Sequence, residues 1–247
     1  GEVFTVTGGM WPRAHKPVEP VGTGFFKTYG AYVDSHEGIE VMYETTAKEF
    51  IVEDGVVTGV IAEGKTGNKV TVKATNGVVL ATGGFAGNVE MRQKYNTQWA
   101  DLGAQIKTTN ASGITGDGIA MAEKVGANLI DMGNIQLLPL GDPETGSLSG
   151  NIEHDVERRI FVNKEGNRFV NEGGRRDEMT QALIAQTDSY MFIVMDSDCY
   201  PTGDEVNNFN ESANDLVAQG RAFKADALED LAKHIGVPAD NLVAAVN

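Results

Sequence analysis

The sequence predicts a chain of mixed α+β or α/β class, and three observations support that prediction. An apolar run beginning at Val78 leads directly into Gly83 and Gly84, which is typical of a buried parallel strand. Alternating segments between residues 47 and 74 predict a small antiparallel meander. Segments with apolar residues at helical spacing lie before, between and after these strands.

The composition of the chain excludes several classes of function. The chain has 247 residues, of which 41% are hydrophobic, so it can bury a core in one or two domains. Its net charge of −15 argues against binding to nucleic acid or to an anionic membrane surface. A single cysteine excludes a disulfide framework and a thiolate metal cluster within this chain, and we expect no metal site. No apolar run is long enough to span a bilayer.

The first part of the chain predicts one helix and several strands. Residues 23–35 carry aromatic side chains at helical spacing, and residues 39–43 predict a short strand. Residues 47–52 and 56–62 flank Asp54-Gly55, a dipeptide that favours a tight hairpin turn, and residues 70–74 predict the third strand of the meander.

Two glycine-rich segments follow. Val78 to Phe85 predicts a strand whose glycines allow a close approach of backbone to a ligand, and residues 89–95 predict a helix. Residues 108–118 form a second glycine-rich loop before a short helix that Gly126 closes. Backbone amides at that helix start could hold an anion, while Asp117 could equally be only a helix cap.

The second half of the chain contains the most informative stretch. Residues 161–170 predict a strand, a turn and a second strand, and a helical period begins near Met179. Arg175 and Arg176 lie at this helix entrance, where the dipole disfavours cations. Either they have a function, or they pair with neighbouring acids and only hold the loop. Residues 226–233 and 240–246 predict two amphipathic helices.

Together these motifs resemble a known family. Ala81 to Phe85, Thr109-Asn110, Thr115 to Gly118, and the stretch from Val162 to Arg176-Asp177 are similar, in order, to the soluble FAD-dependent fumarate reductase and flavocytochrome c flavoproteins. Urocanate reductases and enoate reductases are relatives within that family. The resemblance covers almost the whole chain.

The resemblance implies a central fragment of a longer flavoprotein. Residues 1–132 would be part of a dinucleotide-binding FAD domain, with a parallel sheet and the small antiparallel meander, and residues 133–247 an α+β capping domain. The chain contains no GxGxxG, so the usual phosphate-binding unit would lie elsewhere in the protein. FAD is the implied cofactor of the full-length protein, and we expect the isolated fragment to be inactive and to purify without flavin. The implied cofactor-binding residues are Ala47, Thr82, Gly83, Asn110, Thr115, Gly116 and Asp117.

The resemblance also implies the chemistry. Reduced FAD delivers hydride to the C=C bond of an α,β-unsaturated carboxylate, and an arginine that matches Arg176 supplies the proton. The positive end of the helix dipole would favour proton release from that arginine. Leu138, Glu172 and Arg175 are the implied substrate-binding positions. An electron-donor protein, a haem domain or an FMN domain would be the redox partner, and family members are often extracytoplasmic or periplasmic, with the cytoplasm as the alternative.

Two departures from the family bear on the substrate. Leu138 stands where fumarate reductases have a carboxylate-binding histidine, and the expected Thr-Glu-x-x-Arg motif has no match near Asn151, Ile152 and Asp155. An apolar Leu138 favours a monocarboxylate with a less polar far end, such as an alkyl or aryl acrylate. A ketosteroid dehydrogenase-like flavoprotein and a catalytically silent binding domain are the alternatives, and Arg176-Asp177 argues against the first.

Overall fold

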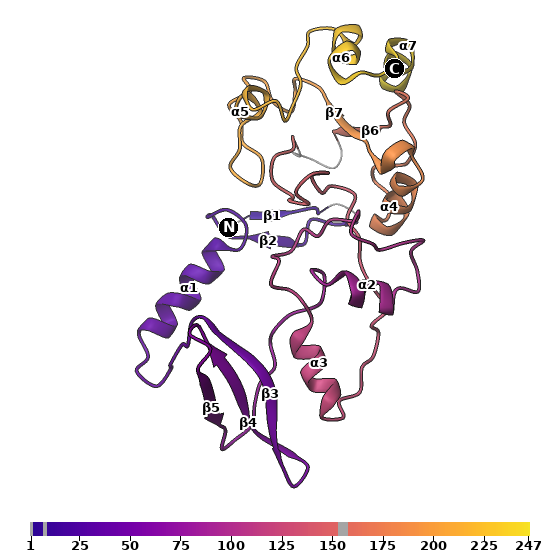
Figure 1. Ribbon diagram of the computed structural model, residues 1–247. Helices are drawn as coiled ribbons and strands as arrows, with labels where there is room; N and C mark the ends of the chain where they lie inside the picture. The colour runs from indigo at the N-terminus through magenta and orange to yellow at the C-terminus, as the bar shows by residue number, and fades with distance from the viewer. Residues whose placement is uncertain (1, 7–8, 153–157) are drawn as a thin grey trace. The chain divides into compact units, whose positions relative to one another are not determined.

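The computed structural model describes residues 2–6, 9–152 and 158–247 (Figure 1). The chain divides into two units, each described here by itself. One unit consists of Gly1–Ser35 together with Gln136–Asn247, and the other is His36–Ile135. The domain limits predicted from the sequence, 1–132 and 133–247, stay a prediction. Among the described residues, none of the helices combines the length and apolar character needed to cross a bilayer.

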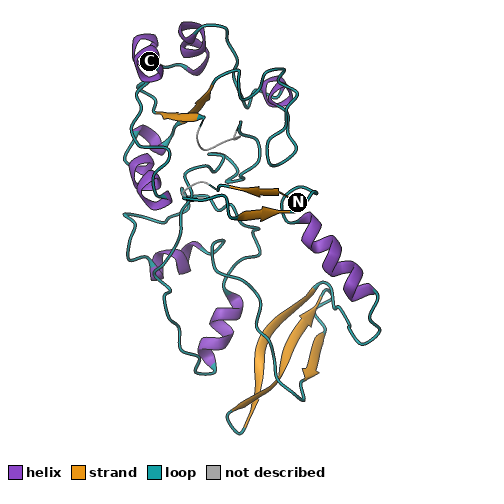
Figure 2. Ribbon diagram, turned by 180° about the vertical axis from the view of Figure 1, so that it is seen from behind, coloured by secondary structure: helices purple, strands orange, loops and turns teal. Residues whose placement is uncertain are grey.

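The unit His36–Ile135 contains the predicted meander. Strands β3 (Thr45–Glu53), β4 (Val56–Gly64) and β5 (Lys69–Lys73) form one antiparallel sheet in the order β3-β4-β5 (Figure 2). Asp54 and Gly55 both have positive φ, 51° and 79°, as the predicted hairpin turn requires. Helices α2 (Val89–Tyr95) and α3 (Asp117–Lys124) confirm the two helices predicted for this unit, and α3 packs against β3 (Figure 1).

Two predicted strands of this unit are wrong. Residues 39–43 form turns and irregular structure, because no neighbouring strand among the described residues pairs with them. Residues 78–85 likewise form no strand, and the side chain of Val79 is 91% exposed. A strand needs hydrogen bonds from a neighbour, and the described residues supply no ladder beside this segment.

The other unit is built around a two-stranded antiparallel sheet. Strands β6 (Arg159–Val162) and β7 (Phe192–Met195) pair so that Phe161 lies opposite Ile193 and Val162 opposite Phe192. Of the predicted second strand after the turn, only an isolated bridge between Val162 and Arg168 is present. The turn Asn163–Gly166 closes the chain before a second strand extends, and β7 takes the place beside β6.

Alternation along this sheet sends its side chains into two cores. Val162, with its neighbour Phe192, packs against Ala232 of α6 (Leu228–Ile235) and Leu242 of α7 (Ala239–Val246). Phe161 packs on the other face against Met179 of α4 (Arg176–Ile184). The remaining elements are β1 (Glu2–Phe4), β2 (Ala14–Lys16), α1 (Thr23–Asp34), the 3-10 turn η1 (Thr187–Ser189) and α5 (Ala213–Ala218). The predicted helices α1, α6 and α7 are thus confirmed.

Candidate active site and cofactor pocket

Arg176 is the first residue of α4. Arg175 precedes the helix in extended conformation, and Asp177 and Glu178 occupy the first turn, where acids compensate the helix dipole. The half-buried Arg176 donates from Nη1 to Oε1 of Gln136 at 3.1 Å. A neutral amide therefore holds one edge of the guanidinium that the resemblance identifies as the proton donor.

Arg175 has a different partner. Its Nε and Nη2 donate to the two carboxylate oxygens of Asp177 at 3.1 and 2.8 Å. These bonds, led by the one from the Arg175 side chain, hold the pKa of Asp177 below its ordinary value. Arg175 thus pairs with a neighbouring acid at the helix entrance, which was one of the two alternatives for these arginines. The substrate-binding role of Arg175 stays a prediction.

Glu172 is 4% exposed, and the protein itself satisfies its carboxylate. Oε1 accepts from the Phe161 backbone N–H at 2.9 Å and from Arg168 Nε at 3.1 Å, and Oε2 accepts from Arg168 Nη2 at 2.7 Å. Burial raises the pKa of Glu172, but the bonds from Arg168 and Phe161 outweigh it and leave the pKa lowered. These contacts tie β6 to the segment before α4. Substrate binding by Glu172 stays a prediction, and the observed contacts are structural.

Leu138 belongs to the same segment as Gln136. It is partly buried and packs against the cluster of Leu140, Phe161 and Met179 beneath α4. The segment therefore contacts α4 through Gln136 at the helix start, and through Leu138 it joins the apolar cluster to which Met179 of α4 belongs. Of the positions compared with the Thr-Glu-x-x-Arg motif, Asp155 lies outside the described residues.

In the other unit, two glycine-rich loops interlock. Gly116 has φ 75° and precedes α3, and a Cβ there would lie 2.5 Å from Met91 Sδ. A Cβ on Gly118 would collide with the Thr82 hydroxyl. The Thr115 carbonyl accepts from Asn88 Nδ2 at 2.9 Å. The second glycine-rich stretch therefore needs glycine at both positions, and the structure brings together Thr82 and the start of α3.

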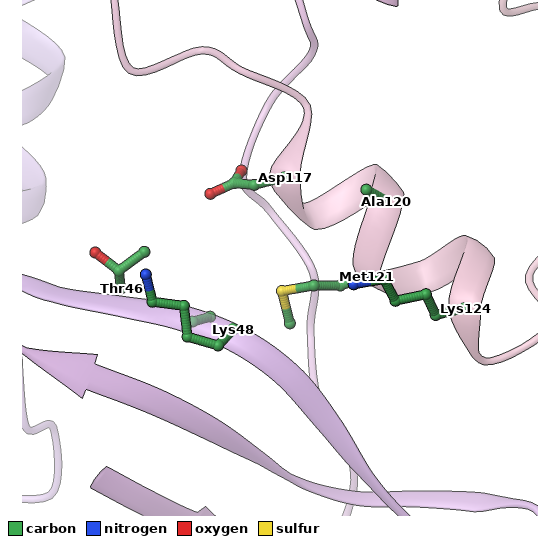
Figure 3. A pocket seen from close by; sticks show the side chains of 7 residues that line it. Thr46, Lys48, Asp117, Ala120, Met121 and Lys124 are labelled. Atoms are coloured by element: carbon green, nitrogen blue, oxygen red, sulfur yellow. The ribbon is translucent and has the colours of Figure 1, made fainter. Parts of the chain in front are cut away.

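A pocket of about 210 Å³ opens between β3 and α3 (Figure 3). It is lined by Thr46, Ala47, Lys48, Asp117, Ala120, Met121 and Lys124. Ala47 and Asp117, two of the predicted cofactor residues, thus share one pocket although they are far apart in sequence. Asp117 also accepts the Gly118 backbone N–H at 2.9 Å, so it makes a local contact at the helix start and lines the pocket.

The remaining predicted cofactor residues lie outside this lining. Gly83 has φ 76° in the loop beside Thr82. Asn110 lies in an exposed turn, where its backbone N–H donates to Thr108 Oγ1 at 3.1 Å. Their cofactor-binding roles stay predictions. The sequence analysis missed Gln136, Lys48 and Lys124, since no local pattern reveals contacts that depend on folding.

The pocket's residues fit part of a dinucleotide. Ala47, Ala120 and Met121 supply apolar surface for a planar ring, Asp117 supplies a carboxylate for hydroxyl groups, and the lysines supply cations for phosphates. That this pocket holds part of the cofactor stays a prediction.

The chain belongs to the family described as FAD binding domain, which matches residues 8–247. FAD as cofactor and a flavoprotein of the fumarate reductase type, both predicted from the sequence, are thereby confirmed at the level of the family. The mixed α/β fold class is likewise confirmed.

The relatives to which the chain is similar include an oxidoreductase and two reductases. The chain is 37% identical over 235 residues to an NADH:acrylate oxidoreductase of Vibrio harveyi, covering 95% of this chain and 23% of that protein. It is 35% identical to a urocanate reductase of Eggerthella lenta, covering 90% of this chain and 36% of that protein. A structure of the open conformation of a flavocytochrome c3 fumarate reductase aligns with a TM-score of 0.70 and 26% identity, covering 98% and 42% of the two chains. The chain thus spans less than half the length of each of these relatives.

Proposed function

We propose that this chain is the part of an FAD-dependent reductase of α,β-unsaturated carboxylates that carries the proton donor. The observation behind this proposal is the placement of Arg176 at the start of α4, with its Nη1 bonded to Gln136 at 3.1 Å. The names of the relatives support the substrate class, since they act on acrylate, urocanate and fumarate.

In this proposal, some residues of the site bind the substrate and one transfers a proton. Reduced FAD, when bound, supplies hydride to the β-carbon of the C=C bond. Arg176 binds the carboxylate side of the substrate and gives a proton to the α-carbon, so that one C=C bond becomes two C–H bonds. Gln136 holds the guanidinium in orientation, and the clamp of Arg168 on Glu172 fixes the segment that leads into α4. Leu138 excludes a second carboxylate, which favours alkyl or aryl acrylates over fumarate.

The cofactor would be held by Ala47, Asp117 and the interlocked glycine loops, with Thr82, Gly83, Asn110, Thr115 and Gly116 at its edge. We place the division between the FAD domain and the capping domain near residue 132. Electrons would arrive from a donor protein, a haem domain or an FMN domain.

A substrate screen on the full-length protein tests the proposal. Oxidation of a reduced dye is followed with acrylate, cinnamate, urocanate and fumarate as acceptors. We expect turnover with at least one of them, and acrylate or cinnamate to exceed fumarate. Full flavin loading without dye oxidation on any acceptor would instead indicate a catalytically silent binding domain.

A further inference from the structure

Two loops of the unit His36–Ile135 contact each other residue by residue. The three contacts follow one another in both loops and join Thr97 to Gly133, Gln98 to Asn134, and Trp99 to Ile135. At the first contact, a Cβ on Gly133 would lie 2.5 Å from Thr97 Oγ1. At the third, the indole Nε1 of Trp99 donates to the backbone carbonyl of Ile135 at 2.8 Å. The chain is therefore held at its last residue in this unit.

Trp99 is itself fixed in place. Its side chain and backbone together are only 8% exposed. The Asn96 side chain accepts the Trp99 backbone N–H at 2.9 Å and donates to the Trp99 carbonyl at 2.7 Å. An indole N–H can only donate, and a buried one needs an acceptor. The Ile135 carbonyl meets that need, so this hydrogen bond ties two well-anchored groups together.

The bonded carbonyl belongs to the peptide group that leads into Gln136. The chain passes from one unit to the other between Ile135 and Gln136. A peptide group is planar, so the Ile135 carbonyl and the Cα of Gln136 lie in one rigid plane. The Gln136 side chain in turn accepts from Arg176 Nη1 at 3.1 Å. A continuous series of two hydrogen bonds and one rigid peptide group thus runs from Trp99 to Arg176.

We propose that Trp99 is a positioning residue for Arg176. The inference rests on the proposed function, in which Arg176 donates the proton, and it goes beyond that function by assigning a role to a residue of the other unit. The indole bond fixes the peptide plane, the plane fixes the Cα of Gln136, and the Gln136 side chain orients the guanidinium. Proton transfer depends steeply on the alignment of donor and acceptor, so a loosened plane should slow it.

Trp99→Phe in the full-length enzyme tests this inference, because it removes the indole N–H and keeps an aromatic ring. With the best acceptor of the dye-oxidation screen, kcat should fall about fivefold, as expected for loss of one neutral hydrogen bond. KM should change less than kcat, because attraction of a carboxylate to a cation depends less on alignment. Trp11→Phe is the matched control, since Trp11 is the other tryptophan of the chain and is 66% exposed.

A double-mutant cycle separates positioning from a general loss of stability. Gln136→Leu breaks the bond to Arg176, so adding Trp99→Phe to it should lower kcat no further. A steric pair gives an independent check on the paired loops. Gly133→Ala should lower kcat because its Cβ meets Thr97, and Thr97→Ala, which removes the obstructing atoms, should restore kcat in the double variant.

Amide hydrogen exchange on the full-length protein adds a readout that needs no turnover. The backbone N–H groups of Asn134 and Ile135 bond to Asp131 and Gly133, and they should exchange faster in Trp99→Phe but not in Trp11→Phe. Unchanged exchange there would overturn the inference, whatever the kinetics show.

Two kinetic results would also overturn the inference. The first is an unchanged kcat in Trp99→Phe while Arg176→Lys loses turnover. The second is a further loss when Trp99→Phe is added to Gln136→Leu, which would assign the effect to destabilisation. Retained turnover in Arg176→Lys together with faster exchange in Trp99→Phe would instead overturn the proposed function and leave the contact between Trp99 and Ile135 supported. The two proposals therefore fail separately.

Discussion

Replacing Arg176 by lysine separates proton donation from structural ion pairing. The substitution keeps a positive charge but removes the planar guanidinium, whose Nη1 donates to Gln136. The start of α4 should survive, because the Thr180 hydroxyl bonds to the backbone carbonyl of Arg176 at 2.8 Å and not to its side chain. The variant therefore changes the chemistry of the side chain with little change in the helix.

The two roles predict effects of different size. Loss of one hydrogen bond to a neutral amide should cost about 1 kcal/mol of folding free energy or less. Loss of a general acid should lower turnover by at least about a hundredfold, equivalent to about 2.7 kcal/mol of transition-state stabilisation. If Arg176 is purely structural, Arg176→Lys should lower the free energy of unfolding and leave turnover unchanged. If Arg176 is catalytic, the substitution should lower turnover.

The assay compares Arg176→Lys with Arg175→Lys in the full-length enzyme. Stopped-flow absorbance measures flavin reduction, steady-state kinetics measures turnover, and thermal melting measures folding. We expect flavin reduction and melting to be nearly unchanged in both variants, and turnover to fall only in Arg176→Lys. Arg175 is the control, since its bonds go to Asp177. Equal losses in the two variants, or retained turnover in Arg176→Lys, would refute the assignment.

Three further predictions concern packing and charge. Leu138→His in the full-length enzyme should raise fumarate turnover relative to acrylate turnover by about tenfold, because it supplies a partner for the second carboxylate, and an unchanged ratio would exclude a role in specificity. The lowered pKa of Glu172 means that its stabilisation is present above the ordinary value of 4.5 and is lost as pH falls through the folded-state value. In urea titrations, the stability difference between wild type and Glu172→Gln should therefore shrink below that pH, and a constant difference would contradict the clamp. Gly118→Ala should destabilise the chain by about 1–3 kcal/mol through its clash with Thr82, whereas Gly30→Ala in exposed α1, with open space around it, should be neutral or stabilising in thermal melts.

Local chemistry explains what the sequence could predict. The meander follows from Asp54-Gly55, since few other residue pairs accept two positive φ angles in succession. The helix pair α6 and α7 follows from Gly236, which ends α6 with φ 74°, and from Pro238 at the start of α7. These signals lie within a few residues of the structure that they specify, so no tertiary contact is needed to interpret them.

What could not be predicted depends on distant partners. The apolar run at Val78 has strand composition, but the described residues place no strand beside it. β7 was missed although residues 191–195 are apolar, because such a short run does not distinguish a strand from a buried helix turn. Gln136 lies 40 residues before Arg176, and a β-bulge at Lys48 is visible only in the register of β3 against β4.

The two adjacent arginines at the start of α4 have different hydrogen-bond partners. The Asp177 carboxylate offsets the charge of Arg175. This ion pair reduces the unfavourable interaction between Arg175 and the positive end of the α4 dipole. Gln136 orients Arg176 through a neutral oxygen, so this contact fixes the guanidinium without offsetting its charge. Asp177 thus stabilises the helix start through Arg175, while an amide 40 residues away orients Arg176, whose proposed role as proton donor Arg176→Lys tests.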